Sequence, residues 1–309
     1  MAAARGAPSD LTASAPALAL LVDTYSLFFR AHFALPPMNT RSGEPTAALY
    51  GFSAALLAEL ARRQPLELAF AVDAPQRTFR HERQPSYKAH RDPTPEPLVA
   101  QLGRLRELLA AFEVPVYQVP GVEADDVLAT LAARLSAAGR EVLIMSGDRD
   151  LLQTVGERVR VLFVGARGQK PVIYDAARVE QRFSVPPGRL PTYVALVGDA
   201  SDNLPRVPGV GPRTACRWVR EHGSAALLVE HAATLEPARL GAEVLARAAQ
   251  VLESELLATL RRDVPLAEGP LVAPLSAAAW RRLGALFSEL EFKSLGARLA
   301  ALSKAPFEA

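Results

Sequence analysis

Short apolar runs and longer amphipathic stretches alternate along the first half of the chain. The apolar runs have the length of strands and predict buried strands at Leu18–Asp23, Leu66–Asp73, Val114–Val119 and Glu141–Ser146. Apolar residues at helical spacing predict helices between them, over Leu49–Arg62, Leu98–Phe112 and Ala124–Ala138, the last ended by Gly139. Strands that alternate with helices predict an α/β fold, with a mostly parallel central sheet flanked by helices.

The pattern changes after residue 150. Leu151–Val155 begins another helix, and Val159–Val164 with Pro171–Tyr174 predicts a hairpin. From Ala176 onward the spacing is mostly helical and is interrupted by Pro and Gly. We therefore expect a disordered tail over 1–17, an α/β core over 18–177 and a helical region over 178–309.

The composition is typical of a folded intracellular protein. Half of the 309 residues are apolar, which excludes a chain that is disordered as a whole. No apolar run reaches the roughly 18 residues of a membrane span, and the opening residues lack the apolar stretch of a secretory signal. The single cysteine, Cys216, excludes an intrachain disulfide and a zinc site built from cysteines. We expect a cytoplasmic protein with no membrane partner.

The formal net charge of +2 conceals an uneven distribution of charge. Nine of the 33 acidic residues fall into five short clusters: Asp23, Asp73, Glu123 with Asp125 and Asp126, Asp148 with Asp150, and Asp199 with Asp202. The rest of the chain therefore carries a large excess of its 35 Lys and Arg residues over acids. Such an excess is typical of a surface that binds polyanions.

The acidic clusters follow the predicted strands. Asp23 and Asp73 each end a strand, and Asp148 follows the strand Glu141–Ser146. Ligands of open parallel sheets bind beyond the carboxyl ends of the strands, so these side chains should project into one crevice. The acids at 123–126 open a helix at the same edge, and Asp199 and Asp202 have the i, i+3 spacing of one helix face. Taken singly, each acid is also explained as a cap or turn residue.

Crowded carboxylates need a compensating charge. Within these clusters only Arg149 supplies one from the sequence, so divalent cations are the natural compensation. All candidate ligands are oxygen donors, which favours Mg²⁺ or Mn²⁺ over zinc. Nine acids are too many for one ion and suit two ions that share a site for phosphoryl displacement.

Two further segments have the features of phosphate-binding elements. The basic stretch Arg77–Arg91, within 76–97, carries Phe79 and Tyr87 among its Arg, His and Lys residues, and is otherwise explained as a solvated loop. The turn Gly209-Val210-Gly211 before Pro212 predicts a helix-hairpin-helix motif at about 199–222. Its exposed N–H groups would hold a duplex phosphate without reading base sequence.

Together these motifs resemble those of the structure-specific 5′ nuclease family, in particular the 5′→3′ exonuclease domain of bacterial DNA polymerase I and flap endonucleases. The resemblance runs from about Leu20 to the C-terminus, in family order and spacing. It rests on Leu-Val-Asp23, Gly43-Glu-Pro, Tyr50-Gly-Phe, Val72-Asp73, Phe79-Arg80, Tyr87-Lys88-x-x-Arg91, Gly121-Val-Glu123-Ala-Asp125-Asp126, Gly147-Asp148-x-Asp150, Gly198-Asp199-x-Ser-Asp202 and Leu286-Phe287-x-x-Leu290-Glu291-Phe292. The family commonly has Gly after its first aspartate, where this chain has Thr24.

The resemblance implies a PIN-like core and a nuclease that cleaves phosphodiesters near single-strand/duplex junctions during replication and repair, with two Mg²⁺ ions. Glu123 and Asp125 would serve the catalytic ion with Asp23, Asp73 and Asp126, and Asp148, Asp150, Asp199 and Asp202 would serve the second. Lys88 and Arg91 would be catalytic together with Glu123, Asp125 and Asp148. DNA contacts would come from Arg30, Arg80, Tyr87, Lys88, Arg91, Gly209, Val210, Gly211, Arg213 and Thr214, with 76–97 as part of a helical arch and K⁺ at the Gly-Val-Gly turn.

Several alternatives differ in the chemistry that they require. A haloacid-dehalogenase-type phosphatase needs an aspartate two residues after Asp23, and Tyr25 stands there. A non-catalytic DNA-binding relative would have lost carboxylates, yet all nine are present. A related ribonuclease remains open, although the hairpin favours duplex DNA. The expected partners are DNA with a 5′ flap, nick or 5′ end, RNA primer strands, and an associated polymerase and ligase, for a monomer that is either a stand-alone nuclease or a fragment.

Overall fold

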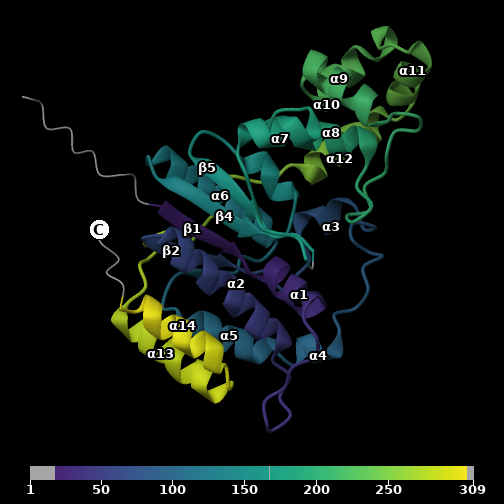
Figure 1. The fold of residues 1–309 in the computed structure, drawn as a ribbon. Coiled ribbons are helices and arrows are strands. Elements are labelled where there is room, and N and C mark those ends of the chain that lie inside the picture. The colour runs from purple at the N-terminus through teal and green to yellow at the C-terminus, as the bar shows by residue number, and fades with distance from the viewer. Residues whose placement is uncertain (1–17, 167, 305–309) are drawn as a thin grey trace, which may run out of the picture.

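A six-stranded sheet forms the centre of the protein (Figure 1). The structure is a computed structural model that describes residues 18–166 and 168–304, so the predicted tail over 1–17 lies outside the described residues. The strands are β1 (Leu18–Asp23), β2 (Glu67–Ala71), β3 (Val116–Tyr117), β4 (Glu141–Ser146), β5 (Val159–Phe163) and β6 (Val172–Tyr174). Their order is β3-β2-β1-β4-β5-β6, and all neighbours are parallel except β5 and β6. The predicted α/β class and the predicted hairpin are confirmed.

The order of the strands creates a switch point beside β1. The chain extends the sheet from β1 to β2 and β3 on one side, and then returns to place β4 on the other side of β1. Val22 of β1 pairs with Met145 of β4, so Asp23 and the residues after Ser146 leave the sheet together. Crevices at such points are the usual ligand sites of open parallel sheets.

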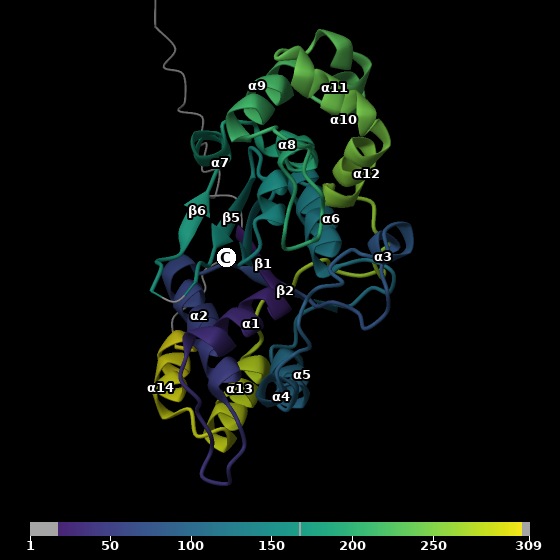
Figure 2. The same cartoon turned by 90° about the vertical axis from the view of Figure 1, so that its right-hand side faces the viewer.

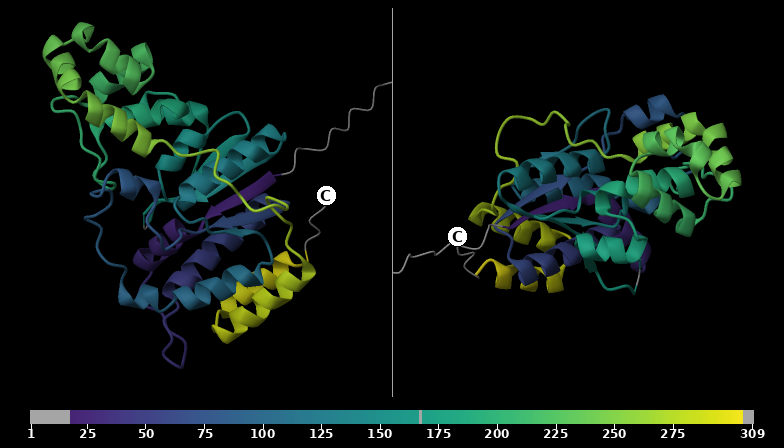
Figure 3. Two further views of the ribbon diagram at one scale, coloured as in Figure 1. Left: turned by 180° about the vertical axis from the view of Figure 1, so that it is seen from behind. Right: turned by 90° about the horizontal axis from the view of Figure 1, so that it is seen from above.

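Each face of the sheet is covered by its own apolar core. Ala19 and Leu21 of β1 face one core, and Leu20 and Val22 face the other, because side chains alternate along a strand. The helix α6 (Ala124–Ala137) covers the first face. The second face is covered by α1 (Thr24–Ala34), α2 (Ala47–Arg63), α5 (Leu102–Ala111), α13 (Ala277–Glu289) and α14 (Lys293–Leu302). Figure 3 shows the sheet between these two layers.

The helices between β6 and residue 258 form a lobe above the first face (Figure 2), and their apolar residues continue the core of that face. They are α7 (Ala176–Phe183), α8 (Leu190–Val197), α9 (Pro212–His222), α10 (Ala225–Glu230), α11 (Ala238–Ala246) and α12 (Ala248–Ala258), with short 3-10 turns at Pro187–Arg189 and Ala232–Thr234. The chain then runs back along the sheet, where Leu68 and Ala273 exchange backbone hydrogen bonds. The helices α13 and α14 therefore pack on the α/β core rather than on the helical lobe. None of the helices in the described part of the chain combines the length and apolar composition that a membrane crossing needs.

Three elements differ from the prediction. The helix α1 was not predicted. The predicted helix Leu98–Phe112 is divided into α4 (Glu96–Val99) and α5. Between them the buried side chain of Gln101 accepts the N–H groups of Ala48 and Leu49 through its oxygen. The helix predicted to begin at Leu151 is a single 3-10 stretch, Asp150–Thr154.

Candidate active site

A cavity of about 930 Å³ lies at the switch point, at the carboxyl ends of β1, β2 and β4. Five carboxylates from these strand ends and from the start of α6 line it: Asp23, Asp73, Glu123, Asp125 and Asp148. Four cationic side chains line the same cavity: Arg30, Lys88, Arg91 and Arg106. The structure therefore brings together most of the acids that the sequence pattern places at the strand ends.

Asp23 connects the end of β1 to the start of α1. Its carboxylate accepts the N–H of Ser26 at 3.3 Å and so caps the helix, and it also accepts the hydroxyl of Ser146 from the neighbouring strand. Burial raises the pKa of Asp23 to about 7 in spite of the Ser146 hydrogen bond, and repulsion from Asp73 and Asp148 adds to the rise. The site thus holds a carboxylate whose charge is not compensated by the protein.

Asp125 shares this environment. Burial, followed by repulsion from Asp148 and Asp23, raises the pKa of Asp125 well above its ordinary range. Asp73 is more exposed, and its Oδ1 accepts the N–H of Ala124 at 2.8 Å, which fixes the start of α6 beside the end of β2. Asp148 donates its N–H to the Ser146 hydroxyl and accepts the N–H of Asp150 at 2.9 Å. Local hydrogen bonds therefore order the loop after β4 within the cavity wall.

The acids Asp150, Asp199 and Asp202 form a second group next to the first. Burial and repulsion from Asp148, Asp202 and Asp199 raise the pKa of Asp150 well above its ordinary range, so Asp148 stands between the two groups. The predicted helical spacing of Asp199 and Asp202 is wrong. Both lie in a turn after α8, where Asp199 and Leu204 exchange backbone hydrogen bonds and Asp199 accepts the N–H and hydroxyl of Ser201.

The segment 76–97 contacts both acidic groups with its basic and aromatic side chains. Lys88 Nζ lies 2.9 Å from Glu123 Oε1 and 3.8 Å from Asp202 Oδ2. The Tyr87 hydroxyl lies within hydrogen-bond distance of the same two carboxylates, at 3.1 Å and 2.8 Å, and Arg91 pairs with Asp202 at 2.9 Å. Burial alone would raise the pKa of Glu123, but Lys88 and Arg80 outweigh it and lower that pKa.

The expected helical arch is largely not helical. Within 76–97 only α3 (Phe79–Arg83) and the start of α4 are helical, and the residues between them form turns and an extended loop, as Figure 2 shows. Pro85, Pro93 and Pro95 interrupt any longer helix. Lys88 has a left-handed backbone with φ of 54°, so Lys88 and Arg91 do not share a helix face. They reach the carboxylates from a turn instead.

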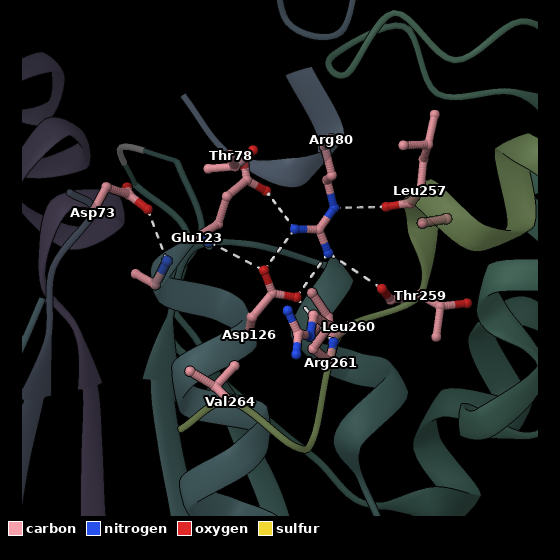
Figure 4. Close-up of polar contacts among 12 residues, drawn as sticks. Asp73, Thr78, Arg80, Glu123, Asp126, Leu257, Thr259, Leu260, Arg261 and Val264 are labelled. Carbon is pink, nitrogen blue, oxygen red and sulfur yellow. Dashed lines mark hydrogen bonds and ion pairs between the residues drawn. The ribbon is translucent and has the colours of Figure 1, made fainter. Parts of the chain in front are cut away.

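Arg80 and Asp126 form a buried pair beneath the cavity rather than part of its lining (Figure 4). The guanidinium binds both oxygens of Asp126, at 2.6 Å and 2.8 Å, and lies 3.2 Å from Glu123 Oε2. It also donates to the carbonyl oxygens of Leu257 and Thr259 at the end of α12, so the guanidinium makes four hydrogen bonds in addition to its ion pair with Glu123. The predicted DNA contact of Arg80 is therefore wrong, since its side chain is 1% exposed.

The same contacts revise the prediction for Asp126. Its side chain is fully buried, and its oxygens accept the N–H groups of Glu123 and Arg261 in addition to Arg80. Asp126 therefore shares the Arg80 guanidinium with Glu123, and all of its other partners are backbone N–H groups. In this arrangement it orients Glu123 rather than offering a free ligand oxygen.

Arg30 lies across the loop that carries Asp148. Its guanidinium donates to the Gly147 carbonyl and stacks on Phe163 at 5.4 Å. A Cβ at position 147 would lie 1.6 Å from Arg30 Nε, so only glycine allows this approach. The Gly147-Asp148 motif therefore places a cation and a carboxylate side by side in the cavity.

The predicted hairpin of the helix-hairpin-helix motif, Gly209-Val210-Gly211, lies between the turn that contains Asp202 and α9. Gly209 has φ of 77° and is exposed, and Gly211 caps α9 with Pro212 at its first position. The N–H groups in the first turn of α9 have no partners within the helix. Arg213 is exposed and Thr214 partly exposed beside them. Val210 differs, because its side chain is buried and its N–H bonds to Val207, so it anchors the turn.

The donor set fits hard divalent cations, because every candidate ligand is a carboxylate oxygen. In residues 18–166 and 168–304, no three Asp, Glu, His or Cys side chains have closed around a single point. Mutual repulsion keeps such groups apart, and Lys88 and Arg91 occupy the oxygens of Glu123 and Asp202. A divalent cation would supply the missing charge for Asp23, Asp125 and Asp150.

The sequence pattern missed some residues that line the cavity. Tyr25, Phe29 and Phe33 of α1 line its wall at i, i+4 and i+8 spacing, and this spacing was visible in the sequence. Ser146 orders Asp23 and Asp148 from the end of β4, and nothing in the sequence distinguishes it from any serine at a strand end.

Comparison with known proteins places this geometry in a family. The model of the 5′-3′ exonuclease N-terminal resolvase-like domain matches residues 18–184, and that of the 5′-3′ exonuclease C-terminal SAM fold matches residues 185–278. DNA polymerase I of Mycobacterium bovis is 40% identical over 303 residues, which cover 97% of this chain and 33% of that protein. The chain thus spans about a third of the length of this relative. The 5′-3′ exonuclease of Aquifex aeolicus is 40% identical over 204 residues, 66% of this chain and 69% of that protein.

Solved structures show the same fold. T5 D15 protein, co-crystallised with metal ions, superposes with a TM-score of 0.64 at 17% identity, over 93% of this chain and all of that chain. The catalytic core of Rad2 in complex with DNA superposes with a TM-score of 0.60 at 14% identity, over 93% of this chain and 92% of that chain. With both family models matched in succession, the chain belongs to the 5′-3′ exonuclease family of nucleases.

Proposed function

We propose that the chain is a divalent-metal-dependent 5′→3′ exonuclease and flap endonuclease, which hydrolyses DNA phosphodiesters near single-strand/duplex junctions. The observation that carries this proposal is the cavity lined by five carboxylates and four cationic side chains. Carboxylates alone would repel a phosphodiester, and cations alone would bind it without reacting. Their combination suits a phosphate that is held while its ester bond is cleaved.

The acidic groups would hold two Mg²⁺ ions, with Mn²⁺ as a substitute. Asp23, Asp73, Glu123 and Asp125 would hold one ion, Asp150, Asp199 and Asp202 the other, and Asp148 stands between them. Bound ions of this kind stabilise the negative charge on the attacking and leaving oxygens. The raised pKa values of Asp23, Asp125 and Asp150 support this assignment, because each of these groups gains from a nearby cation.

Lys88 and Arg91 would hold the scissile phosphate. They lie on the loop between α3 and α4 and line the cavity, and each is paired with a carboxylate. A phosphate that enters the cavity offers its own oxygens to these side chains in place of Glu123 and Asp202. Because the cations are already in position, they can stabilise the negative charge of the transition state without further reorganisation. Arg30 would contact the same strand from α1.

The hairpin at Gly209 and Gly211 would hold the duplex side of the junction through backbone N–H groups. The hairpin is close to the second acidic group along the chain, because the turn that contains Asp202 leads directly into the hairpin. The substrate would thus be held at two places, with the reacting strand in the cavity and the duplex at α9. A K⁺ ion at the hairpin would add to the attraction for phosphate.

Three substrates test the proposal: a 5′-labelled flap, a nicked duplex and a single strand, each with Mg²⁺ and with EDTA. We expect cleavage of the flap near the junction in Mg²⁺, slower removal of nucleotides at the nick, and none in EDTA. A flap of RNA tests whether primers are substrates. Cleavage that persists in EDTA, or that ignores the junction, would overturn the proposal. Such activity would act in DNA replication and repair beside a polymerase and a ligase, in the cytoplasm.

A further inference from the structure

Two turns that are far apart in the sequence lie against each other beside the cavity. One is the turn 84–91, on the loop between α3 and α4, and the other is the turn 199–204, which precedes the hairpin. The backbone N–H of Lys88 donates to the backbone carbonyl of Asp202 at 3.2 Å. This bond joins main chain to main chain, so it does not depend on the charge of either side chain. The two turns are therefore held together by more than the ion pairs of the cavity.

Asn203 joins the two turns in both directions. Its side-chain amide donates to the backbone carbonyl of Ser86 at 2.8 Å, and its own backbone carbonyl accepts the side-chain N–H of Gln84 at 3.2 Å. The φ of Asn203 is 59°, in the left-handed region that asparagine enters more readily than most residues. One residue thus supplies both the bend of the turn 199–204 and the donor for the facing turn.

The turn 84–91 needs contacts of this kind to keep its shape. The φ of Lys88 is 54°, and a left-handed backbone is unfavourable for lysine, so this conformation persists only where the surrounding structure holds it. Apolar packing supplies part of the hold, because the buried ring of Tyr87 lies in one cluster with Leu204 and Leu257. The hydrogen bonds of Asn203 supply a polar part of the same contact.

The turn 199–204 is a fixed base for this contact. Asp199 and Leu204 exchange backbone hydrogen bonds across it, and the chain that follows is tied back to α8 by a backbone hydrogen bond from Val207. A turn that is docked on this base is therefore fixed relative to the cavity.

We propose that Asn203 is a positioning residue for the cleavage, which holds Lys88 and Arg91 in place to receive the scissile phosphate. The inference rests on the proposed function, in which these two cations stabilise the transition state. The described residues that line the cavity include Lys88 and Arg91 but not Asn203, so Asn203 acts through them rather than on the substrate. Cations that are already in position need no reorganisation at the moment of reaction, and the hydrogen bonds of Asn203 contribute to that preorganisation.

The first test measures the docking of the turn 84–91 by limited trypsin digestion in EDTA, without DNA. Cutting after Lys88 and Arg91 requires that the turn leave its base. Asn203→Gly keeps a residue that tolerates positive φ and removes the donor to the Ser86 carbonyl. One net hydrogen bond corresponds to a factor of about 2 to 13 in the open population, so cutting there should be faster by that factor. Cutting after the exposed Arg41 should not change.

Two further variants make this test specific. Gln84→Ala removes the reciprocal bond without altering the turn 199–204, and it should accelerate the same cuts. Ser86→Ala is the matched control, because Asn203 binds the backbone carbonyl of Ser86, which this substitution leaves in place. If Asn203→Gly and Gln84→Ala were cut no faster than Ser86→Ala, Asn203 would not hold the turn, and the proposal would be overturned.

The second test separates positioning from binding in the double variant Asn203→Gly/Gln84→Ala. Its single-turnover rate of flap cleavage at saturating enzyme in Mg²⁺ should fall at least about 5-fold, because two hydrogen bonds no longer preorganise the cations. Its duplex affinity in EDTA should stay at the wild-type value, because the hairpin is unchanged. A wild-type rate, or a loss confined to duplex affinity, would contradict the proposal. If the wild-type chain did not cleave the flap, the proposed function would be refuted instead, and the trypsin result would be unaffected.

Discussion

The substitution Arg80→Met tests whether the buried pair with Asp126 holds the nuclease core to the helical lobe. Arg80 comes from α3, Asp126 from α6, and the two carbonyl acceptors, on Leu257 and Thr259, from the end of α12 (Figure 4). The substitution keeps the apolar part of the side chain and removes all five N–H donors. Asp126 then keeps only the N–H groups of Glu123 and Arg261 as donors for its buried charge.

Removal of one partner from a buried ion pair costs about 3–5 kcal/mol, because the other charge remains buried without compensation. For domains of 150–250 residues, 1 kcal/mol corresponds to about 2–4 °C in Tm. We therefore expect Arg80→Met to lower Tm by about 6–20 °C in EDTA. Arg80→Lys keeps a positive charge but cannot reach all four hydrogen-bond acceptors of Arg80, so its loss of Tm should be intermediate. Circular dichroism during heating and urea titration measure both variants.

The matched control is Arg83→Met, three residues away on the same helix. Arg83 also pairs with a glutamate, Glu253, but its side chain is 47% exposed and the pair is screened by water, so its loss should leave Tm nearly unchanged. If Arg80→Met were as stable as Arg83→Met and instead bound DNA more weakly, then Arg80 would be a DNA contact, and its assignment to the interior would be refuted.

Four further predictions concern the cavity and the hairpin. Lys88→Ala should lower the single-turnover rate about 100-fold, since a preorganised cation contributes about 2.7–4 kcal/mol to the transition state; a loss confined to affinity, and diminished by salt, would make Lys88 a steering residue only. Asp125→Asn or Asp148→Asn should abolish cleavage in Mg²⁺ while DNA binding persists or tightens in a filter assay, and a near wild-type rate would refute the metal assignment. Because the pKa of Asp23 is raised to about 7, the folded protein between about pH 4 and 7 retains a proton that the unfolded chain has released. In EDTA the Tm should therefore fall as the pH rises from about 4 through 7, and it should level off above pH 7. Mg²⁺ should reduce this dependence of Tm on pH. Gly209→Val should raise KM on duplex substrates without changing the single-turnover rate at saturating enzyme. The turn requires a positive φ at this position, and a Cβ there would lie 2.9 Å from the Leu240 side chain. An unchanged KM would make the hairpin an ordinary connection between helices.

The sequence by itself determined that the core contains a mostly parallel sheet and at which edge of that sheet the cavity lies, whereas the order of the strands came from the structure. Continuous apolar runs of strand length predict β1 and β4 with the bounds that the structure has, because a strand that is buried on both faces tolerates few polar residues. The acids at 23, 73 and 148 stand at the last residue of such a strand or two residues beyond it, and parallel pairing brings the strand ends to one edge. The succession of apolar runs and acids along the chain was sufficient to predict this part of the site.

Only the tertiary structure decided what each charged side chain contacts. In the sequence, Arg80 looks like one more basic residue of the segment 76–97. Its burial depends on hydrogen-bond acceptors that lie 46 and more positions away in the chain. The segment 76–97 was expected to be part of a helical arch, yet a left-handed residue in a proline-bounded loop brings Lys88 and Arg91 to Glu123 and Asp202. Neither result follows from periodicity, because an ion pair depends on positions in space and leaves no regular pattern in sequence.

The return of α13 and α14 to the sheet was likewise hidden from the local pattern. Their apolar positions predict amphipathic helices, but amphipathicity does not say which apolar surface a helix will cover. The structure packs Leu283, Phe287 and Leu295 against the same core as Phe52 and Leu56 of α2. The sequence could specify that these apolar faces must be buried, whereas the partner of each face was set by the tertiary packing that removes the most apolar surface from water.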